Sequence, residues 1–401
     1  MTNLRLNSRT LYTYLKRDAA YYPILTVTGP RQSGKTTLVK AAFPEHEYIS
    51  LEETDMRQFA QSDPRGFLDR YSGPVIIDEV QRVPDLFSYL QTVADRDAAP
   101  GRFILAGSQN FLLMEKISQS LSGRTGILHL LPFERAELEN SIRERSKNPS
   151  ALFDNKTSSL KLWDSIFSGY YPRIHNSSIP PEVWLADYIR TYIERDVRSL
   201  VNIGDLERFE RFLTLTAGRT GQILNYSSLA NDCGIALDTA KRWISVLKAG
   251  FIVFLLPPHH RNFNKRVIKS PKLYFYDVGL ACNLLGIRSS EQALSHPLRG
   301  ALFENLIIAE AAKLYTHHRL KPPLYFWRDR TGHEVDLLLD EGGKLFPVEI
   351  KSGQTISPSM FDSLNWWCTQ AGVPRSSATL VYGGSDYQKR DEIAVRPWYS
   401  V

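Results

Sequence analysis

Cysteine is scarce in this chain: there are only three, Cys233, Cys282 and Cys368, and they lie far apart. An odd number of widely separated cysteines cannot form a disulfide framework, and their spacing is not that of a zinc site. Long hydrophobic runs are also absent. The longest, 251–258, is far shorter than the roughly 18 residues needed to span a bilayer, and residues 1–16 contain no apolar stretch of signal-peptide length. We therefore expect a reduced, cytoplasmic protein without a membrane segment.

Internal repeats and low-complexity tracts are absent too, which excludes solenoids, collagen and long coiled coils as the main architecture. The composition, 43% hydrophobic and 23% charged, is that of an ordinary globular protein. A chain of 401 residues exceeds the roughly 250–300 residues at which a single core stops growing, so we expect two to four domains. The 49 basic and 43 acidic residues give a net charge of +6, which permits a polyanionic partner without requiring one.

The first third of the chain alternates short β-rich apolar runs with amphipathic segments. The predicted strands are residues 24–28, 47–51, 74–77, 103–106 and 126–130. This βα alternation predicts a mainly parallel sheet with helices on both faces. The polar stretch 139–157 has the composition of a linker, residues 160–250 have helical periodicity, and mixed α and β patterns return after residue 258.

The first predicted strand runs directly into the pattern G-x-x-x-x-G-K-[ST] and then into a helical stretch. The predicted nucleotide-binding residues of this loop are Gly29, Pro30, Arg31, Gln32, Ser33, Gly34, Lys35, Thr36 and Thr37. The glycines let backbone N–H groups wrap around phosphates, Lys35 reaches the β and γ oxygens, and the Thr36 hydroxyl is a ligand of magnesium. The pattern therefore predicts a site for a nucleoside triphosphate with Mg²⁺.

Polar residues follow the later strands of the same predicted sheet. Asp78 and Glu79 end the strand 74–77, at the edge where open α/β sheets bind ligands. We expect Asp78 to hold the magnesium shell and Glu79 to orient and deprotonate the attacking water. Ser108 is the candidate sensor of the γ-phosphate, with a plain turn as the alternative. Arg124 can stabilise transition-state charge in a neighbouring subunit's site, with a solvated surface arginine as the alternative.

In this order the motifs resemble those of the AAA+ ATPases. More narrowly, residues 78–84, 106–108, 122–124 and 131–133 are similar to the bacterial and archaeal AAA-type ATPases that carry a fused nuclease-like C-terminal domain. The resemblance covers nearly the whole chain. It implies an oligomeric ATPase, usually a ring, with ATP and Mg²⁺ as cofactors and Arg124 supplied in trans. Pro172, in the run Gly-Tyr-Tyr-Pro, resembles the proline that related ATPases pack near adenine.

A helix-turn-helix is predicted in the helical region. Residues 225–232 form a short helix opening with capping residues, 233–235 a tight turn, and 239–249 a second helix capped near Asp238. The strand 251–256 and a polar hairpin would form a wing. Eight Lys or Arg and no acid lie between Asp238 and Asp277, a clustering that suits a phosphate backbone, although such modules also serve as lids or protein contacts. The candidate nucleic-acid contacts are Lys241, Arg242, Lys248, Arg261, Lys265, Arg266 and Lys269.

Three acids and a lysine near the C-terminus form the second candidate site. Glu349 and Lys351 alternate on one predicted strand and share a face, and Asp336 on the adjacent hairpin strand can meet them. Asp336 and Glu349 can share Mg²⁺ or Mn²⁺, Lys351 can position the water or stabilise a phosphate, and Glu304 can complete the shell from a helix. The alternative is a charged, solvated hairpin.

This arrangement resembles the PD-(D/E)XK nuclease superfamily, although Val335 stands where that family has a proline before its first acid. The resemblance implies metal-dependent cleavage, or a nuclease fold that binds DNA without cutting it. The expected fold class is α/β, with a P-loop AAA+ core (1–138), a helical lid (139–204), a winged helix-turn-helix (205–270) and a PD-(D/E)XK-like domain (271–401).

We therefore predict an ATP-hydrolysing homo-oligomeric ring that acts on DNA, with a metal-dependent nuclease as a possible second activity. One alternative is an ATP-controlled switch or DNA-binding regulator whose nuclease fold is inert. Another is a regulatory ATPase whose winged helix and C-terminal domain hold protein partners. RNA in place of DNA also stays open, because phosphate contacts alone do not separate the two.

Overall fold

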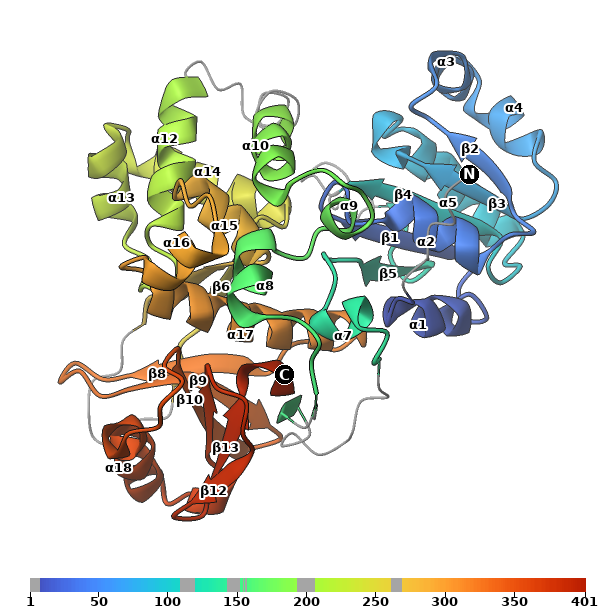
Figure 1. Ribbon diagram of the computed structural model, residues 1–401. Coiled ribbons are helices and arrows are strands. Elements are labelled where there is room, and N and C mark those ends of the chain that lie inside the picture. The colour runs from blue at the N-terminus through green and yellow to red at the C-terminus, as the bar shows by residue number, and fades with distance from the viewer. Residues whose placement is uncertain are drawn as a thin grey trace.

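The N-terminal part of the computed structural model is a five-stranded parallel sheet in the order β2-β3-β4-β1-β5 (Figure 1). The structure describes residues 8–108, 120–142, 152–153, 155, 157–192, 206–260 and 269–401. The strands are β1 (Ile24–Gly29), β2 (Glu47–Ser50), β3 (Val75–Asp78), β4 (Phe103–Ser108) and β5 (Thr125–His129). Each end lies within two residues of its predicted position, which confirms the α/β class and the parallel sheet.

Helices cover both faces of this sheet, because neighbouring residues of a strand point to opposite sides. Leu25 and Val27 pack against α1 and α2, whereas Ile24 packs on the other face in the core that contains residues of α3, α4 and α5. Every residue of β1 and β3 is buried, as expected for strands that are covered on both faces. The helices are α1 (Leu11–Asp18), α2 (Lys35–Ala42), α3 (Thr54–Ser62), α4 (Pro64–Asp69) and α5 (Leu86–Arg96), and the 3₁₀ turn η1 is Val80–Arg82.

The middle of the chain is helical, with one small sheet in which β6 and β7 pair antiparallel. In the predicted helix-turn-helix, the Asn225 side chain accepts a hydrogen bond from the Ser228 N–H, and Gly234 ends α13 in the left-handed conformation. The helices are α7 (Arg135–Leu138), α8 (Leu162–Ser168), α9 (Pro172–His175), α10 (Pro181–Tyr192), α12 (Leu206–Ala217), α13 (Tyr226–Cys233), α14 (Leu237–Ala249), α15 (Val278–Leu284) and α16 (Ser290–Ser295). The strands are β6 (Val253–Leu256) and β7 (Lys272–Phe275).

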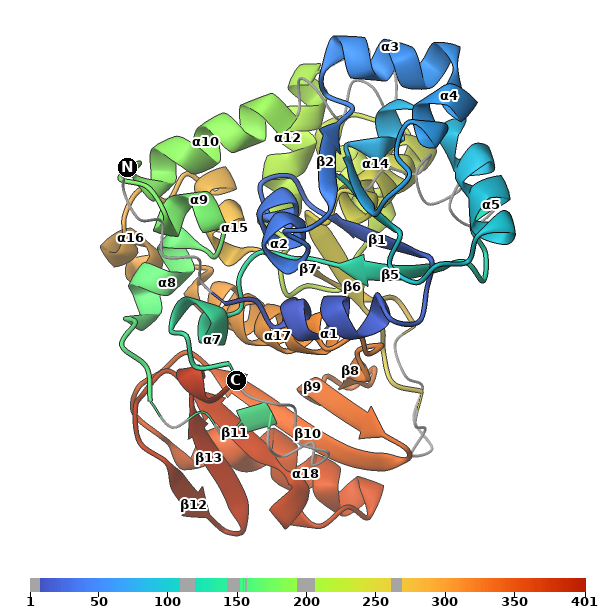
Figure 2. The ribbon, with the colours of Figure 1, turned by 90° about the vertical axis from the view of Figure 1, so that its right-hand side faces the viewer.

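A long helix, α17 (Arg299–His317), lies between the rest of the molecule and a six-stranded C-terminal sheet (Figures 1 and 2). The sheet has the order β12-β13-β11-β10-β9-β8, with α18 (Asp362–Ala371) on its other face. Most residues of α17 are buried, the polar Asn305, Glu310 and Lys313 included, so the helix is covered from both sides. The strands are β8 (Leu324–Arg328), β9 (Glu334–Glu341), β10 (Lys344–Lys351), β11 (Thr379–Tyr382), β12 (Gln388–Arg390) and β13 (Ile393–Pro397). The remaining 3₁₀ turns are η4 (Pro358–Phe361), η5 (Arg375–Ser377) and η6 (Trp398–Ser400).

Two expectations about composition can be compared with the fold. All three cysteines are buried and unpaired, so the prediction that they form no disulfides is confirmed. Among the helices in the described part of the chain, none combines the length and the apolar character needed to cross a bilayer.

Candidate nucleotide site and carboxylate cluster

The predicted phosphate-binding loop borders a cavity of about 930 Å³ at the C-terminal edge of the parallel sheet. Lys35 is buried, and its Nζ donates hydrogen bonds to the carbonyl oxygens of Gly29 (3.1 Å) and Pro30 (2.7 Å). At Gly29 a Cβ would lie 2.1 Å from the Leu130 carbonyl oxygen, and Gly34 has a φ of 92°, so both positions require glycine. The loop sequence therefore produces a tight turn whose lysine and helix α2 face the same cavity.

Most of the predicted nucleotide-binding residues line this cavity. They are Arg31, Gln32, Gly34, Lys35, Thr36, Thr37 and Pro172, and the predicted catalytic residue Glu79 lines it too. The predicted nucleotide-binding residues Gly29, Pro30, Ser33 and Ser108 and the predicted metal ligand Asp78 are not in its lining. Pro172 begins α9, and its Cγ is 3.9 Å from the position that a Cβ on Gly34 would occupy. A segment more than a hundred residues downstream thus closes over the phosphate-binding loop.

Asp78 is held by three hydrogen bonds at the end of β3. Its Oδ2 accepts from the Thr36 hydroxyl (2.7 Å) and the Tyr48 hydroxyl (2.9 Å), and its Oδ1 accepts from the Glu79 N–H (3.0 Å). Burial and the nearby charge of Asp78 raise the pKa of Tyr48, so its phenol stays protonated and donating. A hydroxyl and a carboxylate side by side are the hard oxygen donors that Mg²⁺ prefers, so the residues present fit this ion.

Tyr48 was missed by the sequence analysis. It lies on β2, where its register partner on β3 is Ile76, two residues before Asp78. A tyrosine in the strand segment 47–51 was visible in the sequence, but the strand order that brings it beside Asp78 was not.

Glu79 and Ser108 are linked by a residue to which the sequence analysis gave no role. The Gln81 Nε2 donates hydrogen bonds to the Glu79 Oε2 and, over 3.1 Å, to the Ser108 Oγ. Glu79 has a φ of 54°, a left-handed conformation that is uncommon outside glycine. The chain therefore reverses sharply after β3, and η1 returns the Gln81 side chain towards the end of β4.

Arg124 lies outside the cavity lining of its own chain. Its Nη2 donates to the Asp95 Oδ2 over 3.0 Å, and its Nε contacts the other oxygen of the same carboxylate. The Arg124 side chain is 33% exposed, so this bidentate pair stands at the surface.

The predicted C-terminal residues come together on β9, β10 and α17. The Lys351 Nζ contacts the Glu349 carboxylate and lies 3.9 Å from the Asp336 Oδ2, which also accepts the Ile350 N–H over 2.8 Å. The Glu349 Oε2 is buried and has no hydrogen-bond partner. Burial, with the Asp336 charge as a second cause, raises the pKa of Glu349 to about 8. A buried carboxylate oxygen without a donor fits a site that accepts a cation.

Three further residues of this region were missed: Lys272 and Tyr274 on β7, and Glu334 on β9. The Lys272 Nζ lies 2.9 Å from the Glu304 Oε1 and also pairs with Glu334. The Tyr274 hydroxyl donates to the same Glu304 oxygen over 2.5 Å. Burial raises the pKa of Glu304 to about 7. We call Glu304, Glu334, Asp336 and Glu349 the carboxylate cluster. Glu334 was detectable, because it alternates with Asp336 along one strand.

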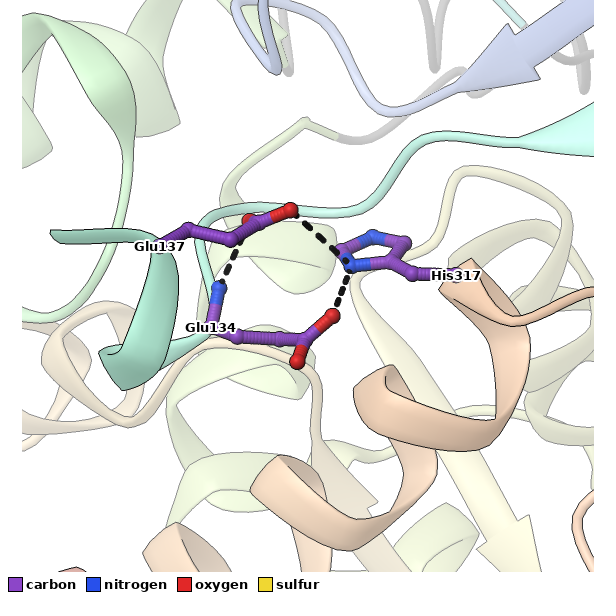
Figure 3. A group of neighbouring side chains, drawn as sticks. All are labelled: Glu134, Glu137 and His317. Carbon is purple, nitrogen blue, oxygen red and sulfur yellow. Dashed lines mark hydrogen bonds and ion pairs between the residues drawn. The ribbon is translucent and has the colours of Figure 1, made fainter. Parts of the chain in front are cut away.

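A second polar group, Glu134, Glu137 and His317, joins the start of α7 to the end of α17 (Figure 3). Within the described part of the chain, it is the only group of three such residues whose ligand atoms all lie within 4.8 Å of one another. His317 Nδ1 is hydrogen-bonded to the Glu134 Oε1, and its Nε2 accepts the Leu131 N–H over 3.0 Å. We call these three residues the junction cluster.

Hydrogen bonds account for the junction cluster without a metal ion. The Glu137 Oε1 accepts the Thr10 N–H (2.8 Å), and its Oε2 accepts the Glu134 N–H (3.0 Å). The Arg9 Nε lies 3.1 Å from the same Oε2 and neutralises the carboxylate. Arg9 also donates from Nη1 to the Ser33 carbonyl (3.1 Å), so the cluster connects the phosphate-binding loop to α17.

The basic residues of the predicted helix-turn-helix are at the surface where the structure describes them. Lys241, Arg242 and Lys248 are exposed on α14, and Lys269 is exposed just before β7. The Lys241 Nζ lies 3.3 Å from the Asp238 Oδ1. The remaining candidates, Arg261, Lys265 and Arg266, lie outside the described residues.

Comparison with known proteins assigns the chain to a family. Residues 21–139 match the AAA domain family, and residues 159–291 and 299–401 match two domains of unknown function, DUF8612 and DUF4143. Over 353 residues the chain is 32% identical to an uncharacterised protein of Mycobacterium tuberculosis and to one of Mycobacterium bovis, covering 87% of this chain and 74% of each relative. The chain belongs to the family of these mycobacterial proteins. Its N-terminal part is a P-loop AAA-type ATPase domain.

Solved structures offer weaker likenesses to this AAA protein. The Walker-type ATPase of Pyrococcus abyssi is 15% identical, with a TM-score of 0.43 over 68% of this chain and 94% of that one. The RuvB protein of Thermotoga maritima is 20% identical, with a TM-score of 0.28 over 62% and 86% of the two chains. With scores below 0.5, neither likeness establishes a shared fold.

Proposed function

We propose that this protein hydrolyses ATP and uses the resulting change of state to act on DNA. The observation that carries the ATPase proposal is the 2.7 Å contact between the Thr36 hydroxyl and Asp78, beside Lys35 and Glu79. In this arrangement Lys35 binds the β- and γ-phosphates, Thr36 and Asp78 hold Mg²⁺, and Glu79 orients the attacking water. Magnesium would neutralise charge on the transferred phosphoryl group.

Phosphate release by wild type, Lys35→Ala and Glu79→Gln tests the ATPase proposal. Lys35→Ala should abolish binding of a fluorescent ATP analogue. Glu79→Gln should retain binding and lose roughly 100-fold or more in turnover, since a general base contributes about that much. Glu47→Gln is the matched control, because Glu47 is exposed on β2. Normal turnover in Glu79→Gln would exclude the role given to Glu79.

For DNA binding, support comes from the exposed basic residues of α14. Lys241, Arg242 and Lys248 project from one helix that packs its apolar side on the core. If they contact phosphates, binding releases counterions, and the logarithm of affinity falls linearly with the logarithm of salt concentration. Replacing all three by alanine should flatten this slope by about 0.9 for each phosphate that is no longer neutralised. Lys321→Ala and Lys344→Ala, at exposed positions elsewhere, serve as controls. Measuring the affinity for RNA of the same sequence distinguishes binding of DNA from binding of RNA.

A second candidate activity is metal-dependent cleavage of DNA at the carboxylate cluster. The buried, unpartnered Oε2 of Glu349, next to Asp336 and Lys351, supports it. Asp336 and Glu349 would hold the metal, and Lys351 would position water or stabilise the phosphate. Glu304 would join the metal shell only after giving up its contact with Lys272.

Cleavage of linear, nicked and branched DNA with Mg²⁺ or Mn²⁺, with and without ATP, tests this second activity. Cutting that needs metal and disappears in Lys351→Ala would support it. Retained DNA-stimulated ATP hydrolysis without cutting would favour the alternative, an ATP-controlled DNA-binding switch or regulator with an inert nuclease fold. If removing the α14 charges changes neither DNA binding nor function, a regulator that binds proteins is favoured instead.

We also propose that the protein forms a homo-oligomeric ring in which Arg124 reaches a neighbour's nucleotide. Its position outside the cavity of its own chain supports this. The proposed domains are the AAA core (1–138), the lid (139–204), the winged helix-turn-helix (205–270) and the nuclease-like domain (271–401). The strands β6 and β7 pair across the last of these boundaries.

A further inference from the structure

Gln81 occupies the space between the ends of two neighbouring strands, β3 and β4. Its Nε2 donates one hydrogen bond to the Glu79 carboxylate and another, 3.1 Å long, to the Ser108 hydroxyl oxygen. A side-chain amide carries two N–H hydrogens, so both are used. The two acceptors belong to different strands and have different proposed tasks: one activates water and the other senses phosphate.

The absence of a side chain at Gly107 leaves room for this amide beside β4. A Cβ on Gly107 would lie 2.2 Å from the Gln81 Oε1, so a side chain at residue 107 would displace the glutamine. The same Oε1 is buried and has no hydrogen-bond partner. A buried amide oxygen without a donor is unfavourable by itself. Its retention indicates that the two hydrogen bonds from Nε2 determine where the side chain lies.

The direction of these bonds matters for the chemistry. Because Nε2 can only donate, the Ser108 oxygen accepts, and the hydroxyl hydrogen of Ser108 is left to donate to another acceptor. Because Gln81 occupies Oε2 of Glu79, the second carboxylate oxygen is left for the attacking water. A phosphate oxygen that takes the Ser108 hydrogen would make the Ser108 oxygen a better acceptor, which strengthens the bond from Gln81.

We propose that Gln81 is a positioning residue that couples the γ-phosphate contact at Ser108 to the orientation of Glu79. Gln81 is not in the lining of the nucleotide cavity, so it would act through the two residues it joins. When Ser108 holds a phosphate oxygen, the Gln81 amide is fixed from one side and fixes the carboxylate on the other. This inference rests on the proposed ATP hydrolysis and adds to it a link through which a phosphate contact at Ser108 strengthens the hold on Glu79.

Steady-state ATP hydrolysis by Gln81→Leu is the first test. The leucine fills similar space but donates no hydrogen bond, so kcat should fall roughly 10- to 100-fold, the range expected when a hydrogen bond to a charged group is removed. The KM for ATP should stay within about threefold, because Gln81 makes no contact that binds nucleotide. A rise in KM at unchanged kcat, or a wild-type kcat, would overturn the proposal. Gln91→Leu is the matched control, since Gln91 lies on α5 with its side chain half-buried.

A double-mutant cycle with Ser108→Ala separates coupling from simple support of the fold. If Gln81 acts between Ser108 and Glu79, the kcat of the double variant should be at least about half the kcat of the slower single variant. Fold-losses that multiply would show that the two residues act independently and would reject the coupling. Gln81→Glu, which keeps the size of the side chain, replaces Gln81→Leu if thermal melting shows that the leucine variant is unfolded.

Wild type and Glu79→Gln, measured in parallel, separate failure of this inference from failure of the proposed function. If wild type releases no phosphate, the proposed ATPase activity is wrong. If wild type is active and Glu79→Gln is not, yet Gln81→Leu turns over normally, the ATPase proposal holds and the role of Gln81 is wrong.

Discussion

The Nζ of Lys272 lies 2.9 Å from the Oε1 of Glu304, so a lysine of the small β6-β7 sheet neutralises a glutamate of α17. The same ammonium group pairs with Glu334, and Lys272 is only 2% exposed. In the sequence Lys272 is the last member of a basic run, but its side chain is buried and its ammonium group contacts Glu304 and Glu334. It therefore supplies a cation to the carboxylate cluster from outside the hairpin that carries Asp336.

Replacing Lys272 by methionine should destabilise the protein. The change leaves Glu304 and Glu334 without their shared cation, and removing one partner of a buried ion pair lowers the free energy of unfolding by about 3–5 kcal/mol. Urea unfolding measures the loss. The double variant Lys272→Met, Glu304→Gln should recover part of it, because one of the two unpaired charges is gone. A single variant as stable as wild type would show that the pair contributes nothing.

The junction cluster should give two variants with opposite pH dependence. Burial, followed by the charge of Glu310, raises the pKa of Glu134 to about 7. Burial lowers the pKa of His317 to about 3. Between about pH 4.5 and 6.5 the unfolded pair holds one proton, on the histidine, and the folded pair also holds one, on the glutamate. In wild type this pair therefore contributes almost no slope to stability against pH.

When one residue of the pair is substituted, the free energy of unfolding should vary with pH as the other residue alone dictates. In His317→Gln the folded state binds a proton at Glu134 that the unfolded state lacks, so stability should fall as pH rises from about 4.5 to 7. In Glu134→Gln the unfolded state binds a proton at His317 that the folded state lacks, so stability should rise with pH up to about 6.5. Each slope approaches 1.4 kcal/mol per pH unit, measured by urea unfolding across the window. Parallel slopes in the two variants would contradict these protonation states.

Removing the Tyr48 hydroxyl should weaken the magnesium site. Tyr48→Phe deletes one of the two hydroxyl groups that donate to the Asp78 Oδ2. We expect turnover to fall by roughly tenfold, the effect of removing one hydrogen bond to a charged group, and the Mg²⁺ concentration for half-maximal turnover to rise. Tyr89→Phe on α5 is the control. Unchanged magnesium dependence would mean that the Tyr48 hydroxyl is not needed to orient Asp78.

Arg124→Ala should lower ATP turnover and leave thermal stability nearly unchanged, because exposed ion pairs contribute little to folding. Asp95→Asn breaks the same pair while keeping the arginine, so it should retain turnover. Mixing Arg124→Ala with Glu79→Gln subunits should restore part of the activity, since one variant supplies the arginine to the other's intact site. If the mixture is no more active than its parts, Arg124 does not act in trans.

The parts of this protein that local sequence determines were predictable. A G-x-x-x-x-G-K-[ST] loop between a strand and a helix has one geometry, so the positions of Lys35 and Thr36 followed from the motif. The alternation of short apolar runs with amphipathic segments located the five parallel strands. The second helix of the helix-turn-helix begins at Leu237, two residues before the predicted start at residue 239, and its N-cap is Ala236 instead of Asp238.

Contacts made by strand order and domain packing were not predictable. Gln81 was visible beside Asp78 and Glu79, but its bond to Ser108 depends on β3 and β4 being neighbours. Lys272 lies 64 residues before Asp336 in the sequence. It follows other basic residues, such as the exposed Lys269, so its neighbours in the sequence do not indicate that it is buried. Arg9 likewise reaches the Ser33 carbonyl from just before α1.

Helix α17 carries His317 of the junction cluster at one end and Glu304 near the other, so a single helix connects the two sites. Thirteen residues separate Glu304 from His317, a span of about 20 Å at 1.5 Å per residue. Through Arg9, the His317 end is tied to the loop that would bind phosphate. A tilt of about 5° around that end moves Glu304 by roughly 1.7 Å over such a span, which is enough to separate it from Lys272. A tilt of α17 about its His317 end would therefore displace the carboxylates more than the phosphate-binding loop.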